Sequence, residues 1–158
     1  MESVAIYDIA DKIKAVFLAF LQIIGQVLFP NVSQTRNRNL TRRGVRIILF
    51  VGLGFYLFSG ALLAIVTPVY FSEYMEVITL FWILGLLIII QPISYLIGTG
   101  VLLVNDLKRQ YTLNLYISMA VYLVLIGICY ILGIISIYTT AYSLVLSAIT
   151  GLTSNVVV

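Results

Sequence analysis

Histidine is absent from this chain of 158 residues, and cysteine occurs once, at Cys129. Zinc sites of histidine and cysteine, Cys-ligated iron–sulfur clusters and histidine-dependent catalytic triads therefore lack their ligands or bases. The sequence also has no P-loop, no G-x-S-x-G turn and no H-E-x-x-H motif. We therefore expect no enzyme activity, no cofactor and no metal.

Charge is scarce as well. Only 9% of the residues are charged and 62% are hydrophobic, whereas a soluble domain carries roughly 25% charged residues. The mean hydropathy is +1.13. A net charge of +3 is too small to predict nucleic-acid binding. Because lipid cannot satisfy free backbone amides, this composition predicts an all-α integral membrane protein.

Long uncharged stretches define the expected spans, because a bilayer core of about 30 Å needs about 20 apolar helical residues. They occupy residues 45–70, which are uncharged apart from Arg46 at the start, and residues 77–104 and 111–158. The last is about twice one span, so we expect it to fold back after residue 135, within the polar cluster 136–143. Residues 144–158 would then be a re-entrant or interfacial tail, or a further short span. We predict a bundle of three to four transmembrane helices over residues 47–158, with an amphipathic helix preceding it.

The charges predict the orientation, because short loops rich in Lys and Arg stay on the cytoplasmic side. Segment 105–110 contains Lys108 and Arg109, while the connection 71–76 contains Glu73 and Glu76. We expect loops 30–46 and 105–110 to be cytoplasmic, and two N-glycosylation sequons in the first to be chance matches. Loop 30–46 contains five arginines: Arg36, Arg38, Arg42, Arg43 and Arg46.

Residues 1–29 form the expected N-terminal amphipathic helix. At 100° per residue, one narrow face collects polar and small residues. Two structures fit this pattern: an interfacial helix with this face toward water, or a spanning helix that buries its glutamine end against neighbouring helices. Lys14 lies on the apolar side and is expected to reach the headgroup layer. The residues of the polar face are Asp8, Asp11, Lys12, Ala15, Ala19, Gln22 and Gln26.

Two features of the spans concern packing. Pro92, after Gln91, removes a backbone donor and clashes with the carbonyl four residues earlier, which predicts a helix kink at the middle of its span. The kink either exposes carbonyls and the Gln91 amide to a substrate or serves packing alone. Small residues also recur where helices can approach one another, either within the chain or between chains. We expect contacts at Gly52, Gly60, Ala64, Gly98 and Gly127.

The five arginines predict contact with anionic headgroups, each contributing about 1 kcal/mol. Docking to an acidic surface of another subunit is the second interpretation, since arginine forks onto carboxylates. Topology alone also explains these charges.

We expect a non-catalytic multispan subunit that packs into and stabilises a larger membrane protein complex, through other subunits or self-association. One alternative is an oligomeric channel or facilitator with a path lined by Gln91, Ser94, Tyr95, Gln22 and Gln26. Another is a membrane-shaping or vesicle-sorting protein that uses the N-terminal helix as a wedge. Apart from Arg46 at the start of the first, no acidic or basic residue lies in the three apolar stretches, which argues against a pump or coupled transporter.

Overall fold

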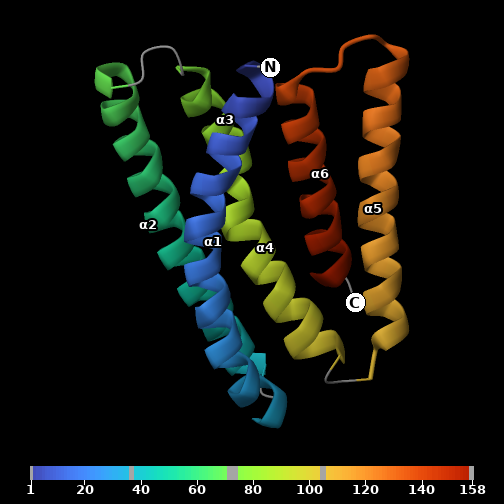
Figure 1. The fold of residues 1–158 in the computed structure, drawn as a ribbon. Coiled ribbons are helices and arrows are strands. Elements are labelled where there is room, and N and C mark those ends of the chain that lie inside the picture. The colour runs from blue at the N-terminus through green and yellow to red at the C-terminus, as the bar shows by residue number, and fades with distance from the viewer. Residues whose placement is uncertain (1, 36–37, 71–74, 104–105, 157–158) are drawn as a thin grey trace.

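The computed structural model describes residues 2–35, 38–70, 75–103 and 106–156, and the regular structure in these ranges is helical throughout. The prediction of an all-helical chain is confirmed. The helices run alternately down and up the bundle, except that the α3 and α4 segments follow one another in the same direction (Figure 1). The elements are α1 (Glu2–Thr35), α2 (Arg38–Tyr70), α3 (Glu76–Leu84), α4 (Leu86–Ile97), the π-helix η2 (Gly98–Leu103), α5 (Lys108–Ile131) and α6 (Ile137–Val156).

Three helical segments are long and apolar enough to cross a membrane, as the sequence predicted. They are Leu40–Val69, Glu76–Ile97 and Lys108–Ile131. The middle segment, α3 with α4, is the centre of the bundle, since 56% of it is buried, against 22% of the first and 6% of the third. Most of its side chains are apolar, which is typical of a helix surrounded by other helices.

The N-terminal helix α1 packs lengthwise along this centre. Near its start, Ile6 and Ala10 are buried in one cluster with Val77, and further along Leu21 is buried with Ile88. Among the described residues, α1 is not one of the segments long and apolar enough to cross a membrane, so the spanning and interfacial alternatives both stay predictions.

The segment predicted as a basic loop, 30–46, differs from expectation. It is helical up to Thr35 in α1 and again from Arg38 in α2, and residues 36–37 lie outside the described ranges. Arginine is a good helix former, and charge alone does not end a helix. The charge pattern marks the end of a span but not the end of the helix that contains it.

The fold-back near the C-terminus also lies earlier than predicted. Gly133, with φ of +66°, follows α5, and its amide donates to the Tyr130 carbonyl while that of Ile134 donates to Cys129. This is a Schellman ending, which favours glycine. Ser136 then caps α6, because its Oγ accepts from the Thr139 amide and its own amide donates to Thr139 Oγ1. The polar cluster 136–143 therefore begins a helix rather than a turn, and 144–156 continues it.

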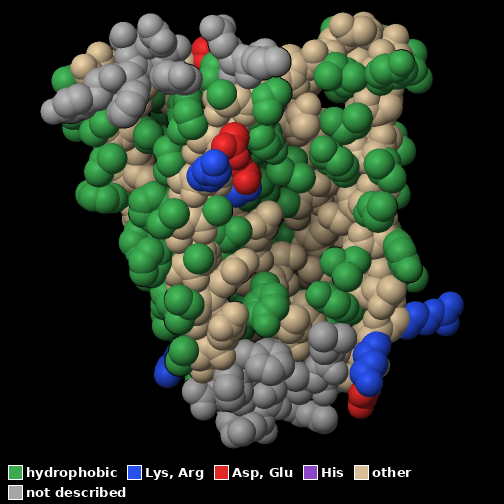
Figure 2. Space-filling model, viewed as in Figure 1, with side chains coloured by type: hydrophobic (Ala, Val, Ile, Leu, Met, Phe, Trp, Pro, Cys, Tyr) green, Lys and Arg blue, Asp and Glu red, His purple; other side chains and the backbone are tan. Residues whose placement is uncertain are grey.

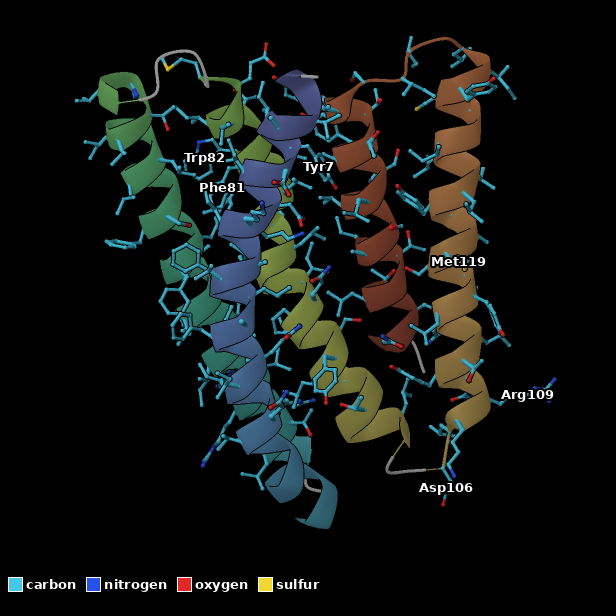
Figure 3. All side chains as sticks on the ribbon, viewed as in Figure 1. Tyr7, Phe81, Trp82, Asp106, Arg109 and Met119 are labelled. Atoms are coloured by element: carbon cyan, nitrogen blue, oxygen red, sulfur yellow. The ribbon has the colours of Figure 1, made fainter. Side chains whose placement is uncertain are left out.

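The two basic segments lie at one end of the bundle. The beginnings of α2 and α5 are both at the lower end in Figure 1, while Glu76 begins α3 at the upper end. Figure 3 shows Asp106 and Arg109 at the lower end of α5, and Tyr7 near the upper end of α1. The alternation of basic and acidic segments thus corresponds to opposite ends of the fold. Glu73 lies outside the described residues.

Candidate functional site

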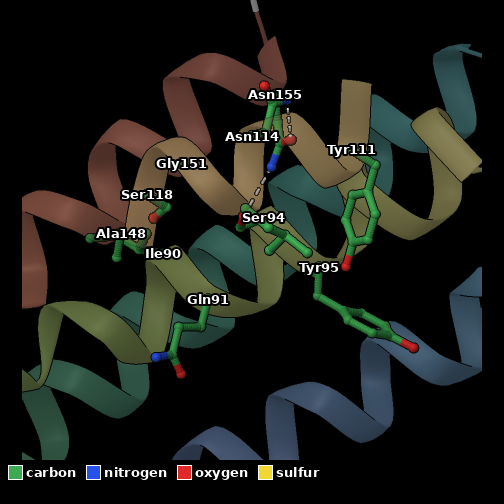
Figure 4. A pocket seen from close by; sticks show the side chains of 11 residues that line it. Ile90, Gln91, Ser94, Tyr95, Tyr111, Asn114, Ser118, Ala148, Gly151 and Asn155 are labelled. Carbon is green, nitrogen blue, oxygen red and sulfur yellow. Dashed lines mark hydrogen bonds between the residues drawn. The ribbon is translucent and has the colours of Figure 1, made fainter. Parts of the chain in front are cut away.

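A cavity of about 270 Å³ lies between α4, α5 and α6 (Figure 4). Each of the three helices contributes at least one polar residue and at least one apolar or small residue to the cavity lining. Among the described residues, no acidic or basic one lines the cavity. The lining residues are Ile90, Gln91, Ser94, Tyr95, Tyr111, Asn114, Leu115, Ser118, Ala148, Gly151 and Asn155.

Side-chain hydrogen bonds connect the three helices beside the cavity. Asn114 Nδ2 donates to Asn155 Oδ1 at 2.8 Å, and Asn155 Nδ2 donates to Ser94 Oγ at 3.2 Å. Ser154 Oγ also donates to Asn114 Oδ1, at 2.6 Å. Asn114 and Asn155 are buried, so an unmet amide here would carry its full desolvation penalty. The network therefore holds α5 and α6 against α4.

Other polar groups at the cavity remain available. Within the described part of the chain, the Gln91 amide and the hydroxyls of Tyr95 and Tyr111 have no hydrogen-bond partner. In Figure 4, the Gln91 and Tyr95 side chains extend away from the Asn114–Asn155 pair toward α1. The cavity therefore offers donors and acceptors without charge, which suits a neutral hydrogen-bonding molecule or water.

The first half of α1 carries two ion pairs. Lys12 Nζ lies 2.6 Å from Asp8 Oδ2, and both side chains are exposed. Lys14 pairs with Asp11, and its side chain is only 9% exposed. Figure 2 shows these charges as one small group on a face that is largely apolar. The Lys14 side chain thus lies buried beside Asp11, and its contact with the headgroup layer stays a prediction.

The spanning alternative predicted that the glutamine end of the polar face of α1 would be buried against neighbouring helices. The described helices of this chain do not bury it. Gln22 and Gln26 are both exposed, whereas Leu21 and Gly25 beside them are buried. These glutamines do not line the cavity, which contains the other three residues expected on a path: Gln91, Ser94 and Tyr95.

The basic residues are exposed where they are described. Arg42, Arg43 and Arg46 project from the first turns of α2, and Lys108 and Arg109 from the start of α5. Arg36 lies outside the described residues, and Arg38 lies in α2 without a described side chain.

Three of the small residues predicted at helix contacts lie at contacts within the chain. A Cβ at Gly52 would meet Ile89 at 3.3 Å, one at Gly60 would meet Trp82 at 2.6 Å and one at Gly98 would meet Tyr111 at 2.6 Å. Gly127 has open space beside it, and Ala64 is exposed. The pair Gly60 and Ala64 therefore does not form one seam within the chain.

The helix runs without a break through Gln91 and Pro92, and the break between α3 and α4 lies earlier, at Gly85. A Cβ atom at position 85 would lie 2.7 Å from the Tyr56 ring, which is too close. Only glycine therefore allows the contact between Tyr56 and the backbone at this position. Pro92 is buried within α4. The kink at Gln91 and Pro92 stays a prediction.

Sequence reasoning missed the network residues Asn114 and Asn155. One signal was available: Ser143, Ser147, Gly151 and Asn155 recur every four residues and form one buried stripe of α6. Ser118 Oγ donates to the Ser147 carbonyl at 2.7 Å, and Ser118 lies four residues after Asn114. Two polar stripes at matching spacing predict a helix pair, but not which helices pair.

Comparison with known proteins gives no relative: no family, no curated protein and no solved structure matches this chain.

Proposed function

We propose that this protein is a non-catalytic multispan membrane subunit that packs into a larger membrane protein complex. Its basic end faces the cytoplasm, and the three apolar segments cross the bilayer with α1 and α6 beside them. The observation that carries this proposal is the uncovered polar face of α1. Polar side chains that face lipid are costly, so such a face calls for another protein helix or a water-filled space.

The depth of the charged turn strengthens the argument. The ion pairs lie between two points where α1 is packed: Ala10 is buried in the cluster that runs from Val77 to Leu87, and Phe17 packs against the cluster of Phe81 and Ile88. The members that α3 and α4 contribute to these clusters all lie within the apolar segment Glu76–Ile97. The ion pairs of α1 therefore lie at the level of an apolar span and not beyond its end.

Native sizing tests the proposal. Protein extracted from its membrane in mild detergent is expected to migrate as an assembly larger than one chain. Replacing Gln22 and Gln26 by leucine should shift material toward the single-chain size, whereas replacing the exposed Thr112 and Thr153 by valine should not. A single-chain size for the unaltered protein in several mild detergents and in nanodiscs would refute it.

A second candidate function, a facilitator for a neutral solute, is favoured by the cavity. Its uncharged lining and free Gln91 amide suit water or a small polyol, and its position among the helices resembles that of a solute path. Purified protein in liposomes should raise water or glycerol flux, and Gln91→Leu should abolish the increase while Gln22→Leu keeps it. Flux equal to that of empty liposomes would exclude this function. The membrane-shaping alternative is favoured least, because α1 is packed along the bundle.

A further inference from the structure

The polar face of α1 has the spacing of a coiled-coil seam. Its positions advance by four, three, four, three and four residues, which places two in every heptad. All of these side chains are exposed. The seam consists of Asp8, Lys12, Ala15, Ala19, Gln22 and Gln26.

This seam points away from the rest of the chain. The opposite side of α1 carries the buried residues Ile6, Ala10 and Leu21, which pack against α2, α3 and α4. In Figure 1, α1 stands in front of α4, and none of the described helices crosses its outer side. A heptad seam packs against a helix that has the same repeat. Because no described helix of this chain contacts the seam, we infer that the partner helix belongs to another chain.

The chemistry of the seam is complementary to itself. Gln22 and Gln26 each carry donors and an acceptor, so identical glutamines from two chains can satisfy one another. Ala15 and Ala19 lie one turn apart and allow two backbones to approach closely, as small residues do between membrane helices. Asp8 and Lys12 already form a neutral ion pair in each chain, so the two copies bring no net charge to the seam.

We propose that the seam binds the α1 helix of a second copy of this chain, as a parallel pair about a two-fold axis along the bundle. The helices are parallel because both copies place the same basic ends on the same side of the membrane. This inference rests on the proposed function and names the partner of the uncovered face.

Cysteine crosslinking tests the pairing, and the chain supplies a matched control. In a Cys129→Ser background, single cysteines are placed at the seam positions 15, 19, 22 and 26. The control cysteines are placed one residue later, at 16, 20, 23 and 27, which are also exposed and have the same spacing. Each full-length variant is oxidised in its membrane with copper phenanthroline, and dimer is measured by non-reducing electrophoresis.

We expect at least about fivefold more dimer for the seam set than for the control set, because only close Cβ pairs form disulfides. Equal crosslinking in both sets, or crosslinking only in the control set, would overturn the proposal.

Spin labels at the same positions separate failure of the pairing from failure of the proposed function. Shielding of the seam labels from both oxygen and a water-soluble nickel chelate, without seam crosslinking, would reject the second copy but retain a different protein partner. Oxygen access equal to that of the control labels would place the seam in lipid, and both proposals would fail.

A bulk substitution gives an independent measurement. Ala15→Phe with Ala19→Phe should convert the dimer to single chains, because the rings separate the two helices. The matched variant changes the exposed Ala61 and Ala64 of α2 to phenylalanine and should leave the dimer intact. Loss of the dimer only in the α2 variant would move the interface to α2 and refute the α1 pair.

Discussion

Asn114 Nδ2 donates a hydrogen bond of 2.8 Å to Asn155 Oδ1, and this bond joins the one buried side chain that the structure gives α5 to the last turns of α6. The other described side chains of α5 are partly or fully exposed. The amide pair is therefore a buried polar contact between α5 and α6, beside partly exposed side chains that pack along the rest of the two helices.

Asn114→Leu should weaken the attachment of α5, because it leaves Asn155 Oδ1 and the Ser154 hydroxyl without their partner. We expect a loss of about 1–2 kcal/mol in unfolding free energy, measured by denaturation in mixed micelles. Thr112→Val is the control, since Thr112 Oγ1 donates only to the Lys108 carbonyl of its own helix. A stability of Asn114→Leu equal to that of the control would show that the pair does not hold α5.

Gly60 and Gly54 form a matched pair on α2. A Cβ on Gly60 would lie 2.6 Å from the Trp82 ring, whereas one on Gly54 meets nothing within 4 Å. The Trp82 ring cannot move away freely from Gly60. Its centroid lies 5.1 Å from that of the Tyr56 ring in an edge-on contact, and the Trp82 backbone carbonyl accepts a hydrogen bond from the Tyr56 hydroxyl.

Gly60→Ala should therefore destabilise the protein by about 1–3 kcal/mol through overpacking. Gly54→Ala should be neutral or stabilising by up to about 1 kcal/mol. Thermal unfolding in micelles measures both, and adding Trp82→Phe should recover part of the Gly60→Ala loss. A Gly60→Ala protein as stable as Gly54→Ala would contradict the tight α2–α3 contact.

Side-specific labelling tests the orientation. In a Cys129→Ser background, cysteines replacing Arg43 and Lys108 should react with an impermeant maleimide from one side of sealed membranes. A cysteine replacing Glu76 should react only from the other side, because it lies at the opposite end of the bundle. Reaction of all three from the same side would reject the orientation and the depth assigned to the α1 charges.

The exposed Arg42, Arg43 and Arg46 should bind anionic lipid. Changing all three to glutamine is expected to lower the affinity for phosphatidylserine in nanodiscs by roughly 3 kcal/mol at low salt, since each contributes about 1 kcal/mol. The loss should shrink as salt is raised, because screening weakens the wild-type attraction. Lys12→Gln is the control, because Lys12 lies on α1 away from these arginines and is paired with Asp8. Affinity that is unchanged in the triple variant would reject lipid binding at this site.

Local chemistry explains which parts of the fold were predictable. The apolar runs determined where three long helices lie, and the alternation of arginine and glutamate determined which connections share an end. The start of α6 was also encoded locally, in Gly133 and in the spacing of Ser136 and Thr139. It was misassigned because polar residues that cap a helix resemble those of a turn.

The sequence by itself thus determined that the chain is helical, how long its apolar segments are and that α1 has one polar face. Only the tertiary structure decided that this face lies outside the bundle, and that Asn114, Asn155 and Ser94 meet across three helices. Helical periodicity specifies the direction of a side chain about its own helix axis, because each residue turns by a fixed angle. The rotation of one helix against its neighbours arises from packing, in which small residues such as Gly52 and Gly60 decide how closely two helices approach.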